Sequence, residues 1–168
     1  MRVISIRQEP IYKETAAKYI HSKWGNETNY QLYESSIFGC VSTTKPLPHW
    51  YLLEDDNEII GCAGLIDLDF ISRTDLSPWL CSLFIEENHR GMALGSLLIK
   101  QIKKDAAKER FERIYLCTDL NGFYEKYDFH YIGEGFCCDG KPTKIYEAVI
   151  PFSSALPSLL PHQYPFLK

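Results

Sequence analysis

The sequence Trp-Leu-Cys-Ser-Leu-Phe-Ile-Glu-Glu-Asn-His-Arg-Gly-Met-Ala-Leu-Gly-Ser-Leu-Leu, residues 79–98, decides the fold. Its apolar run, residues 80–85, predicts one buried strand. After a short polar turn, small residues lead into a helix that we expect to continue to about Arg110. Small residues let a ligand approach the backbone, and the free N–H groups at a helix start favour anions. The segment therefore predicts a phosphate-binding loop, to which Arg90 adds a fixed cation.

The order of residues in this loop excludes two common phosphate-binding motifs. It lacks the Gly-Lys-Ser/Thr of a P-loop and the Gly-x-Gly-x-x-Gly order of a dinucleotide site. Residues 90–95, Arg-Gly-Met-Ala-Leu-Gly, instead resemble motif A of the Gcn5-related N-acetyltransferase (GNAT) superfamily, Arg/Gln-x-x-Gly-x-Gly/Ala. Ala93 stands where that family usually has its middle glycine. The alternative is a glycine-rich turn that precedes a helix without binding anything.

A second stretch supports the resemblance. Residues 123–129, Phe-Tyr-Glu-Lys-Tyr-Asp-Phe, resemble motif B of the same superfamily, Phe-Tyr-Glu-Lys-x-Gly-Phe, and follow a predicted strand over residues 114–118. Asp128 replaces the usual glycine, and we expect a left-handed backbone there, which Asp tolerates better than most residues. The two motifs have the family's order and spacing, so the resemblance covers roughly residues 1–150.

The resemblance implies a mixed α/β (α+β) fold. Its central sheet has six to seven mostly antiparallel strands, splayed between the fourth and fifth, with about four helices. Periodicity predicts further strands over residues 2–7, 49–53, 59–70, 131–133 and 144–151, and helices over residues 11–24 and 30–38, the second closed by Gly39. We expect one acetyltransferase domain over residues 1–151, followed by a proline-rich tail over residues 152–168.

Composition and charge argue against several classes of function. The chain has 168 residues and a net charge of −4, which argues against a nucleic-acid partner. No apolar run reaches ~18 residues and the first residues are too polar for a signal peptide, so we expect no membrane partner and a cytoplasmic location. The six cysteines form no C-x-x-C pair and are expected to be mostly buried free thiols, although the vicinal pair Cys137-Cys138 leaves metal or redox use open. No metal site is expected, because no His, Cys or Asp pattern has ligand spacing.

The resemblance implies that acetyl-coenzyme A donates an acetyl group to a primary amine of a small molecule or peptide, by direct attack in a ternary complex. It places the pantetheine arm along the backbone of residues 83–85 and the pyrophosphate at the loop of residues 91–96. The expected coenzyme-binding residues are Leu83, Phe84, Ile85, Arg90, Gly91, Met92, Ala93, Leu94, Gly95, Ser96 and Asn121. The alternative function is a non-catalytic module that binds and senses acyl-CoA.

Tyr124 is the expected general acid, because the resemblance places its hydroxyl beside the coenzyme sulfur. A phenol with a pKa of about 10 is protonated at neutral pH and can donate to a departing thiolate. The general base is less defined. Asp67, Asp69 and Asp75 are candidates near the end of a long strand, where Asp67 and Asp69 are expected on one face. The alternative for each is an exposed surface carboxylate.

The acceptor amine is the least constrained part of the hypothesis. In the family, the first two helices form one wall of the acceptor cleft, which makes Trp24, Tyr30 and Tyr33 candidates to touch the substrate, and Trp79 is a further candidate. The alternative for each is packing in the core. Aminoglycosides, polyamines, amino acids and protein N-termini all stay open as acceptors, and a homodimer stays open as the assembly.

Overall fold

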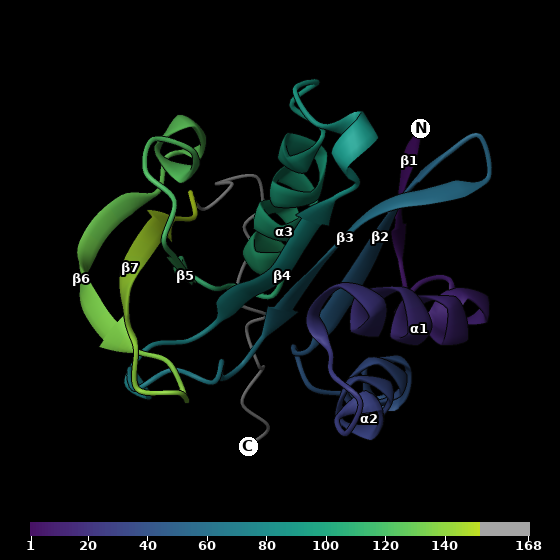
Figure 1. The fold of residues 1–168 in the computed structure, drawn as a ribbon, viewed down its shortest axis with the longest axis horizontal. Coiled ribbons are helices and arrows are strands. Elements are labelled where there is room, and N and C mark those ends of the chain that lie inside the picture. The colour runs from purple at the N-terminus through teal and green to yellow at the C-terminus, as the bar shows by residue number, and fades with distance from the viewer. Residues whose placement is uncertain (152–168) are drawn as a thin grey trace, which may run out of the picture.

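The structure, a computed structural model, describes residues 1–151, and the expected proline-rich tail, residues 152–168, lies outside the described residues. Seven strands form one sheet in the order β1-β2-β3-β4-β5-β7-β6 (Figure 1). The strands are β1 (Arg2–Ser5), β2 (His49–Asp55), β3 (Glu58–Ile66), β4 (Trp79–Ile85), β5 (Arg113–Thr118), β6 (His130–Phe136) and β7 (Pro142–Val149).

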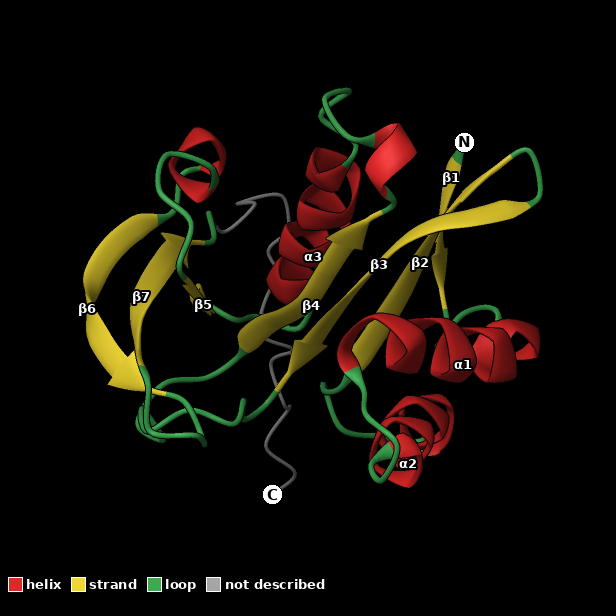
Figure 2. Ribbon diagram, in the orientation of Figure 1, coloured by secondary structure: helices red, strands yellow, loops and turns green. Residues whose placement is uncertain are grey.

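Helices cover both faces of this sheet (Figure 2). The α-helices are α1 (Lys13–Trp24), α2 (Tyr30–Ser42) and α3 (Gly95–Lys108), and the 3-10 helices are η1 (Pro10–Tyr12), η2 (Glu87–His89) and η3 (Tyr124–Tyr127). The buried side chains of α1 and α2 pack on one face and those of α3 pack on the other. Where about four helices were expected, the described chain has three α-helices and three short 3-10 helices. Helix α2 continues past Gly39, because that glycine has an ordinary helical backbone.

The expected splay lies between β4 and β5, the fourth and fifth strands. They form the sheet's parallel pair and are in register at one position only, Trp79 opposite Tyr115. The N–H of Tyr115 also donates to the carbonyl of Pro78 at 2.9 Å. Beyond this point the two strands diverge (Figure 1). The rest of β4, residues 80–85, is therefore paired with β3 alone and has a free backbone edge toward β5.

A β-bulge in β4 sets which side chains face which helix layer. The register between β3 and β4 shifts opposite Ser82, whose φ is +53°. In a regular strand, residues three apart point to opposite faces. Here the extra residue brings Leu80 and Leu83 to the same face, toward α3, while Cys81 and Phe84 face α1 and α2.

Strand β3 ends earlier than its apolar pattern predicts, at Ile66 rather than near residue 70. Its partner β4 begins at Trp79, opposite Ile66, so β4 has no residues with which Asp67 and those after it could pair. Asp67 accepts a hydrogen bond from the Ser77 hydroxyl at 2.7 Å, and Asp69 accepts one from the N–H of Phe70 at 2.8 Å. The expectation that both carboxylates lie on one face of a strand was wrong, because both belong to the loop that follows it.

The length and polarity of a helix decide whether it can span a membrane. Within residues 1–151, each helix is too short or too polar to cross a bilayer.

Candidate active site

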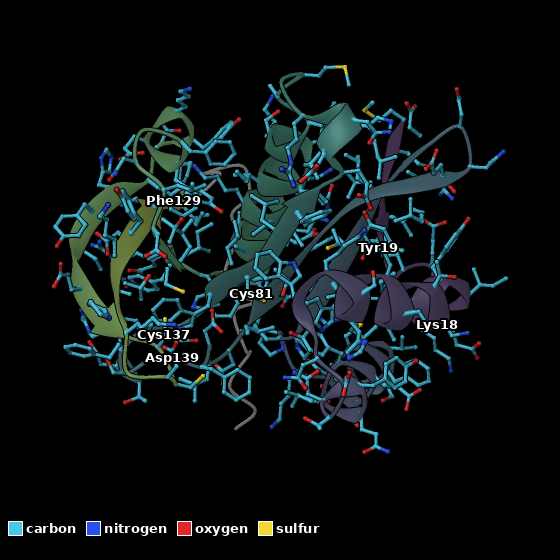
Figure 3. All side chains as sticks on the ribbon, in the orientation of Figure 1. Lys18, Tyr19, Cys81, Phe129, Cys137 and Asp139 are labelled. Carbon is cyan, nitrogen blue, oxygen red and sulfur yellow. The ribbon has the colours of Figure 1, made fainter. Side chains whose placement is uncertain are left out.

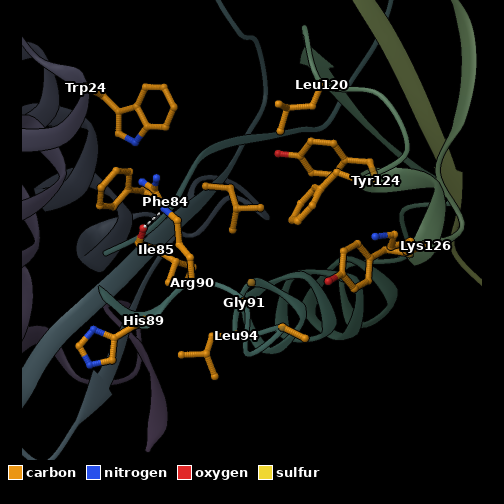
Figure 4. A pocket seen from close by; sticks show the side chains of 15 residues that line it. Trp24, Phe84, Ile85, His89, Arg90, Gly91, Leu94, Leu120, Tyr124 and Lys126 are labelled. Atoms are coloured by element: carbon orange, nitrogen blue, oxygen red, sulfur yellow. Dashed lines mark hydrogen bonds between the residues drawn. The ribbon is translucent and has the colours of Figure 1, made fainter. Parts of the chain in front are cut away.

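A cavity of about 720 Å³ opens where β4 and β5 diverge, beside the start of α3. It brings together β4, the loop before α3, the motif-B segment and the end of α1 (Figure 4). The residues that line it are Trp24, Leu83, Phe84, Ile85, His89, Arg90, Gly91, Ala93, Leu94, Gly95, Leu120, Phe123, Tyr124, Lys126 and Tyr127.

The loop that leads into α3 offers a row of free backbone donors. Gly91 and Ala93 have φ values of +83° and +55°, which curl the chain before the helix begins. The N–H groups of residues 91–95 make no hydrogen bond with other described residues, and no side chain caps the helix. Curled backbone of this kind, with free donors at the positive end of a 14-residue helix, is suited to a phosphate or pyrophosphate.

Two cationic side chains, those of Arg90 and Lys126, line the same cavity. Arg90 lies against β4: its Nε donates to the carbonyl of Ile85 at 2.9 Å, and its guanidinium lies 5.4 Å from the centre of the Phe84 ring (Figure 4). The guanidinium thus stays at the cavity edge with further N–H groups available to an anion.

Tyr124 lies opposite this loop, on η3. Its ring packs edge-on against Phe123 and Phe129, with centroids 4.9 Å and 5.8 Å away. Its hydroxyl points into the cavity and has no hydrogen-bond partner among the described residues (Figure 4). Burial, with a smaller contribution from the Cys117 thiol, raises the pKa of Tyr124 to about 12. The hydroxyl is therefore a proton donor at neutral pH.

The turn after η3 holds Tyr124 in place. Asp128 has φ +62°, as expected from its position in the motif, and closes the 3-10 turn. The N–H of Phe129 then donates to the carbonyl of Tyr124 at 3.3 Å. A left-handed residue at 128 is what lets Phe129 return to the core beneath the tyrosine ring.

Most of the predicted coenzyme-binding residues line this cavity, and three do not. Met92 and Ser96 contribute backbone near the loop, but their side chains do not line the cavity, and Met92 points outward with its side chain exposed. The amide oxygen of Asn121 accepts a hydrogen bond from Lys144 at 2.5 Å, outside the cavity. We therefore leave the Asn121 side chain out of the site.

The predicted substrate-binding residues lie in different parts of the structure. Trp24 is about half exposed and lines the cavity. Tyr30 packs edge-on against His21 and lines neither described cavity. Trp79 is fully buried, donates from its indole nitrogen to the carbonyl of Leu76 at 2.7 Å, and packs on Tyr115. Trp79 thus anchors the one position at which β4 and β5 pair, and a role in touching substrate does not fit its position.

Several lining residues lay outside the predicted set, namely His89, Leu120, Phe123, Lys126 and Tyr127. Lys126 and Tyr127 belong to motif B itself. In a 3-10 turn, side chains three residues apart lie on the same side, which places Tyr127 with Tyr124 and Lys126 with Phe123. Had the motif been treated as one turn, its spacing would have identified them.

A second cavity, of about 630 Å³, lies on the opposite side of β4, against α2. Asp67, Asp69 and Tyr33 line it. Asp75 does not: both its oxygens accept hydrogen bonds from Arg73, at 2.9 Å and 2.7 Å, and the pair is exposed. The three carboxylates expected near one another are thus divided between this cavity and the surface.

The six cysteines are free thiols. Cys40, Cys62 and Cys81 are buried, Cys117 and Cys137 are partly buried, and Cys138 is exposed. Within residues 1–151, no group of three or more His, Cys, Asp or Glu side chains has the spacing of a metal site.

Comparison with known proteins gives one family match. The family described as "Acetyltransferase (GNAT) family" matches residues 9–129. No curated protein matches the sequence.

Solved structures resemble the chain in fold. An aminoglycoside 6'-N-acetyltransferase complexed with coenzyme A is 18% identical, with a TM-score of 0.67 over 90% of this chain and 98% of that one. The aminoglycoside 6'-N-acetyltransferase from Enterococcus faecium is 20% identical, with a TM-score of 0.64 over the same shares. An acyl-CoA N-acyltransferase from Pseudomonas aeruginosa is 16% identical, with a TM-score of 0.62 over 88% of this chain and 99% of that one. At these identities the likeness establishes the fold.

Proposed function

This chain belongs to the acetyltransferase (GNAT) family, and from that premise we propose that it transfers an acetyl group from acetyl-coenzyme A to a primary amine. One relationship carries the proposal. The free N–H groups of residues 91–95 and the unpartnered hydroxyl of Tyr124 face one cavity from opposite sides, and the free edge of β4 runs between them. A neighbouring structure of the same fold is described as holding coenzyme A.

The residues present suit such a cosubstrate. The loop of residues 91–95 supplies donors for a pyrophosphate, with Arg90 and Lys126 beside it. Leu83, Phe84 and Ile85 provide an apolar wall, on a part of β4 that is not paired with β5. An extended, amide-bearing chain can pair with such an edge as an added strand does.

The position and raised pKa of the Tyr124 hydroxyl favour a catalytic function over coenzyme binding alone. In acyl transfer from a thioester, a neutral amine attacks the carbonyl carbon and a thiolate departs. With its pKa raised to about 12, the Tyr124 hydroxyl keeps its proton until it can donate it to the departing sulfur. A hydroxyl that faces the cavity and is not engaged by other described residues suits a proton donor better than a module that only senses the coenzyme.

The acceptor is expected to be cationic before it reacts. Two of the neighbouring structures are named aminoglycoside 6'-N-acetyltransferases, and two carboxylates line the second cavity. Positively charged amines that carry hydroxyl groups are therefore the acceptors to test first, with polyamines and peptide N-termini next.

Two measurements test the proposal. Coenzyme A and acetyl-coenzyme A should each raise the melting temperature of the protein, because a ligand that binds only the folded state stabilises it. Thiol release from acetyl-coenzyme A should then increase with kanamycin, spermidine or a short peptide as acceptor. No thermal shift at saturating coenzyme would refute the proposal, whereas a shift without turnover across the panel would favour the sensing module.

A further inference from the structure

Lys103 of α3 reaches across to the turn that carries Tyr124. Its ammonium group donates a hydrogen bond to the backbone carbonyl of Tyr127, the last residue of η3, and lies 5.2 Å from the centre of the Phe129 ring. It also pairs with the carboxylate of Asp128 at 3.6 Å. One side chain of a helix that is distant in sequence therefore contacts three consecutive residues of this turn.

The contacts of Lys103 differ in strength. Its side chain is 21% exposed, whereas that of Asp128 is 90% exposed, so water weakens their ion pair. The carbonyls at the end of a helix have no donor within the helix, and a lysine placed there satisfies one of them. A charged donor to a carbonyl and an ammonium group beside an aromatic ring are both stronger away from water. The contacts with Tyr127 and Phe129 therefore account for most of the attachment.

This attachment joins the two parts of the candidate active site. Helix α3 begins at Gly95, directly after the loop whose N–H groups are free, and Lys103 lies about two turns further along the same helix. The loop and the turn are thus connected through a rigid helix and one side chain. The turn and the residue before it contribute four residues to the cavity lining, namely Phe123, Tyr124, Lys126 and Tyr127.

Phe129 connects the attachment with Tyr124. The N–H of Phe129 donates to the carbonyl of Tyr124 at 3.3 Å, and the two rings pack edge-on with centroids 5.8 Å apart. Phe129 is fully buried and lies between the turn and the start of β6 (Figure 3). From the sheet, Tyr146 of β7 donates a hydrogen bond to Glu125 at 3.0 Å. The turn is therefore held by Tyr146 on the side of the sheet and by Lys103 on the side of α3.

Resting on the proposed function, we infer that Lys103 is a positioning residue, whose hydrogen bond to the Tyr127 carbonyl keeps the Tyr124 hydroxyl within reach of the donor sulfur. Lys103 does not line the cavity, so it acts through Tyr124 and not on the substrate. Proton donation requires the hydroxyl to lie within hydrogen-bond distance of the departing sulfur. A displacement of about 1 Å is therefore enough to slow the reaction while the proton donor itself is still present.

Lys103→Met tests this inference, because methionine keeps most of the apolar side chain and removes the charged donor. Lys104→Met is the matched control, since Lys104 is an exposed lysine of the same helix. Lys103→Arg retains a charged donor and should behave as the unmodified protein does. Each variant is compared with the unmodified full chain.

Nuclear magnetic resonance reports the surroundings of Tyr124 directly, with coenzyme A as the probe. Labelling with ¹³C at Cζ gives a signal for each of the 11 tyrosines, and Tyr124→Phe identifies that of Tyr124. Coenzyme A should shift this signal in the unmodified protein, in Lys104→Met and in Lys103→Arg. In Lys103→Met, coenzyme A should bind within about threefold of its normal affinity, because the distant loop of residues 91–95 is unchanged. The shift of the Tyr124 signal should nevertheless fall by about half or more, because the hydroxyl has moved away from the thiol.

Thiol release from acetyl-coenzyme A, with an acceptor from the panel above that supports turnover, is the second readout. Lys103→Met should lower kcat about tenfold and leave KM for acetyl-coenzyme A within about twofold. In a Tyr124→Phe background, the same substitution should change kcat less than about twofold, since the hydroxyl that Lys103 positions is absent. A lysine that only stabilised the fold would lower kcat equally in both backgrounds.

The outcomes separate this inference from the proposed function. Absence of coenzyme binding by the unmodified protein refutes the proposed function. Coenzyme binding that leaves the Tyr124 signal of the unmodified protein in place refutes the inference alone. An equal shift of that signal in Lys103→Met, or equal losses of kcat in the two backgrounds, also refutes the positioning role. If Lys103→Met does not fold, Lys103→Arg decides, because a Tyr124 signal that coenzyme A no longer moves in this variant contradicts the inference.

Discussion

The hydroxyl of Tyr51 donates a hydrogen bond to the carboxylate of Asp105 across 3.0 Å in the protein interior, joining β2 to α3. Gln101 and Lys108 complete the partners of Asp105, each at 2.7 Å. The link holds α3 against β2, and the loop at the active site leads directly into this helix.

Tyr51→Phe should destabilise the protein by about 1–2 kcal/mol, because a buried hydrogen bond is lost while the ring still packs. Urea denaturation followed by circular dichroism measures the change. Tyr12→Phe is the matched control: its hydroxyl accepts a hydrogen bond from Arg2 at the surface, and its loss should cost no more than about 0.5 kcal/mol. Equal effects of the two variants would mean that the Tyr51 link adds no stability.

Asp105 should also make stability depend on pH in the acid range. Burial alone would raise its pKa, but hydrogen bonds from Lys108, Gln101 and Tyr51 outweigh that effect and leave the pKa below its ordinary value. The stability that Asp105 contributes is therefore full above its unfolded pKa, about 3.9, and is lost as the pH falls through the lower folded value. Asp105→Asn should be less stable at pH 7 and lose less stability than the unmodified protein between about pH 5 and pH 2. Parallel stability–pH curves for the two proteins would contradict this.

The two motifs were enough to predict the centre of the fold. Residues 90–95 and 123–129 carry short-range chemistry: a loop of small residues before a helix, and a turn that needs a left-handed residue at Asp128. Such features depend on neighbouring residues in the chain, so they can be recognised in sequence. The loop leading into a helix, the left-handed Asp128 and the splay between the fourth and fifth strands were all confirmed, whereas phosphate binding by that loop stays a prediction.

The features that sequence reasoning missed depend on contacts between distant segments. The bulge at Ser82 arises from pairing with β3, and a left-handed serine has no sequence signature. The end of β3 is set by where β4 begins, which moved Asp67 and Asp69 off the strand. The contact between Lys103 and the carbonyl of Tyr127 joins segments that are far apart in the sequence, so it is visible only once α3 and η3 are packed.

Tyr124→Phe should lower kcat for acetyl transfer about 100-fold, because general acid catalysis contributes a factor of this order. Coenzyme affinity should stay within about twofold, since the ring still packs on Phe123 and Phe129. With its pKa raised to about 12, Tyr124 should also produce no falling alkaline limb in the rate profile between about pH 7 and pH 10. Tyr131→Phe, on the exposed side of β6, is the control. Turnover by Tyr124→Phe that equals that of the unmodified protein over this range would exclude the acid role.

Ala93→Gly should stabilise the protein by about 0.5–1 kcal/mol. Ala93 has φ +55°, a conformation that costs an alanine about 1–2 kcal/mol and that glycine adopts freely, while the greater freedom of glycine in the unfolded chain offsets part of the gain. The matched control is Ala107→Gly in regular helix α3, which should lose about 1 kcal/mol. Thermal denaturation distinguishes the two signs. Equal losses in both variants would show that the loop at residue 93 is unstrained.

Arg90→Ala should weaken coenzyme A binding roughly tenfold, the equivalent of about 1.4 kcal/mol for a charge-assisted hydrogen bond to a phosphate. The expected loss is moderate, because Arg90 in the described structure already donates to the carbonyl of Ile85 and lies over Phe84, and reaching a phosphate would give up part of those contacts. Salt screens exposed charges, so affinity should fall with rising salt more steeply for the unmodified protein than for Arg90→Ala. Calorimetric titrations with coenzyme A at low and high salt measure both quantities. Arg113→Ala, an exposed cation on β5 that pairs with Glu147, should change neither. If Arg90→Ala matched the unmodified protein in affinity and in salt dependence, the diphosphate would have to be held by the backbone of residues 91–95 without help from Arg90.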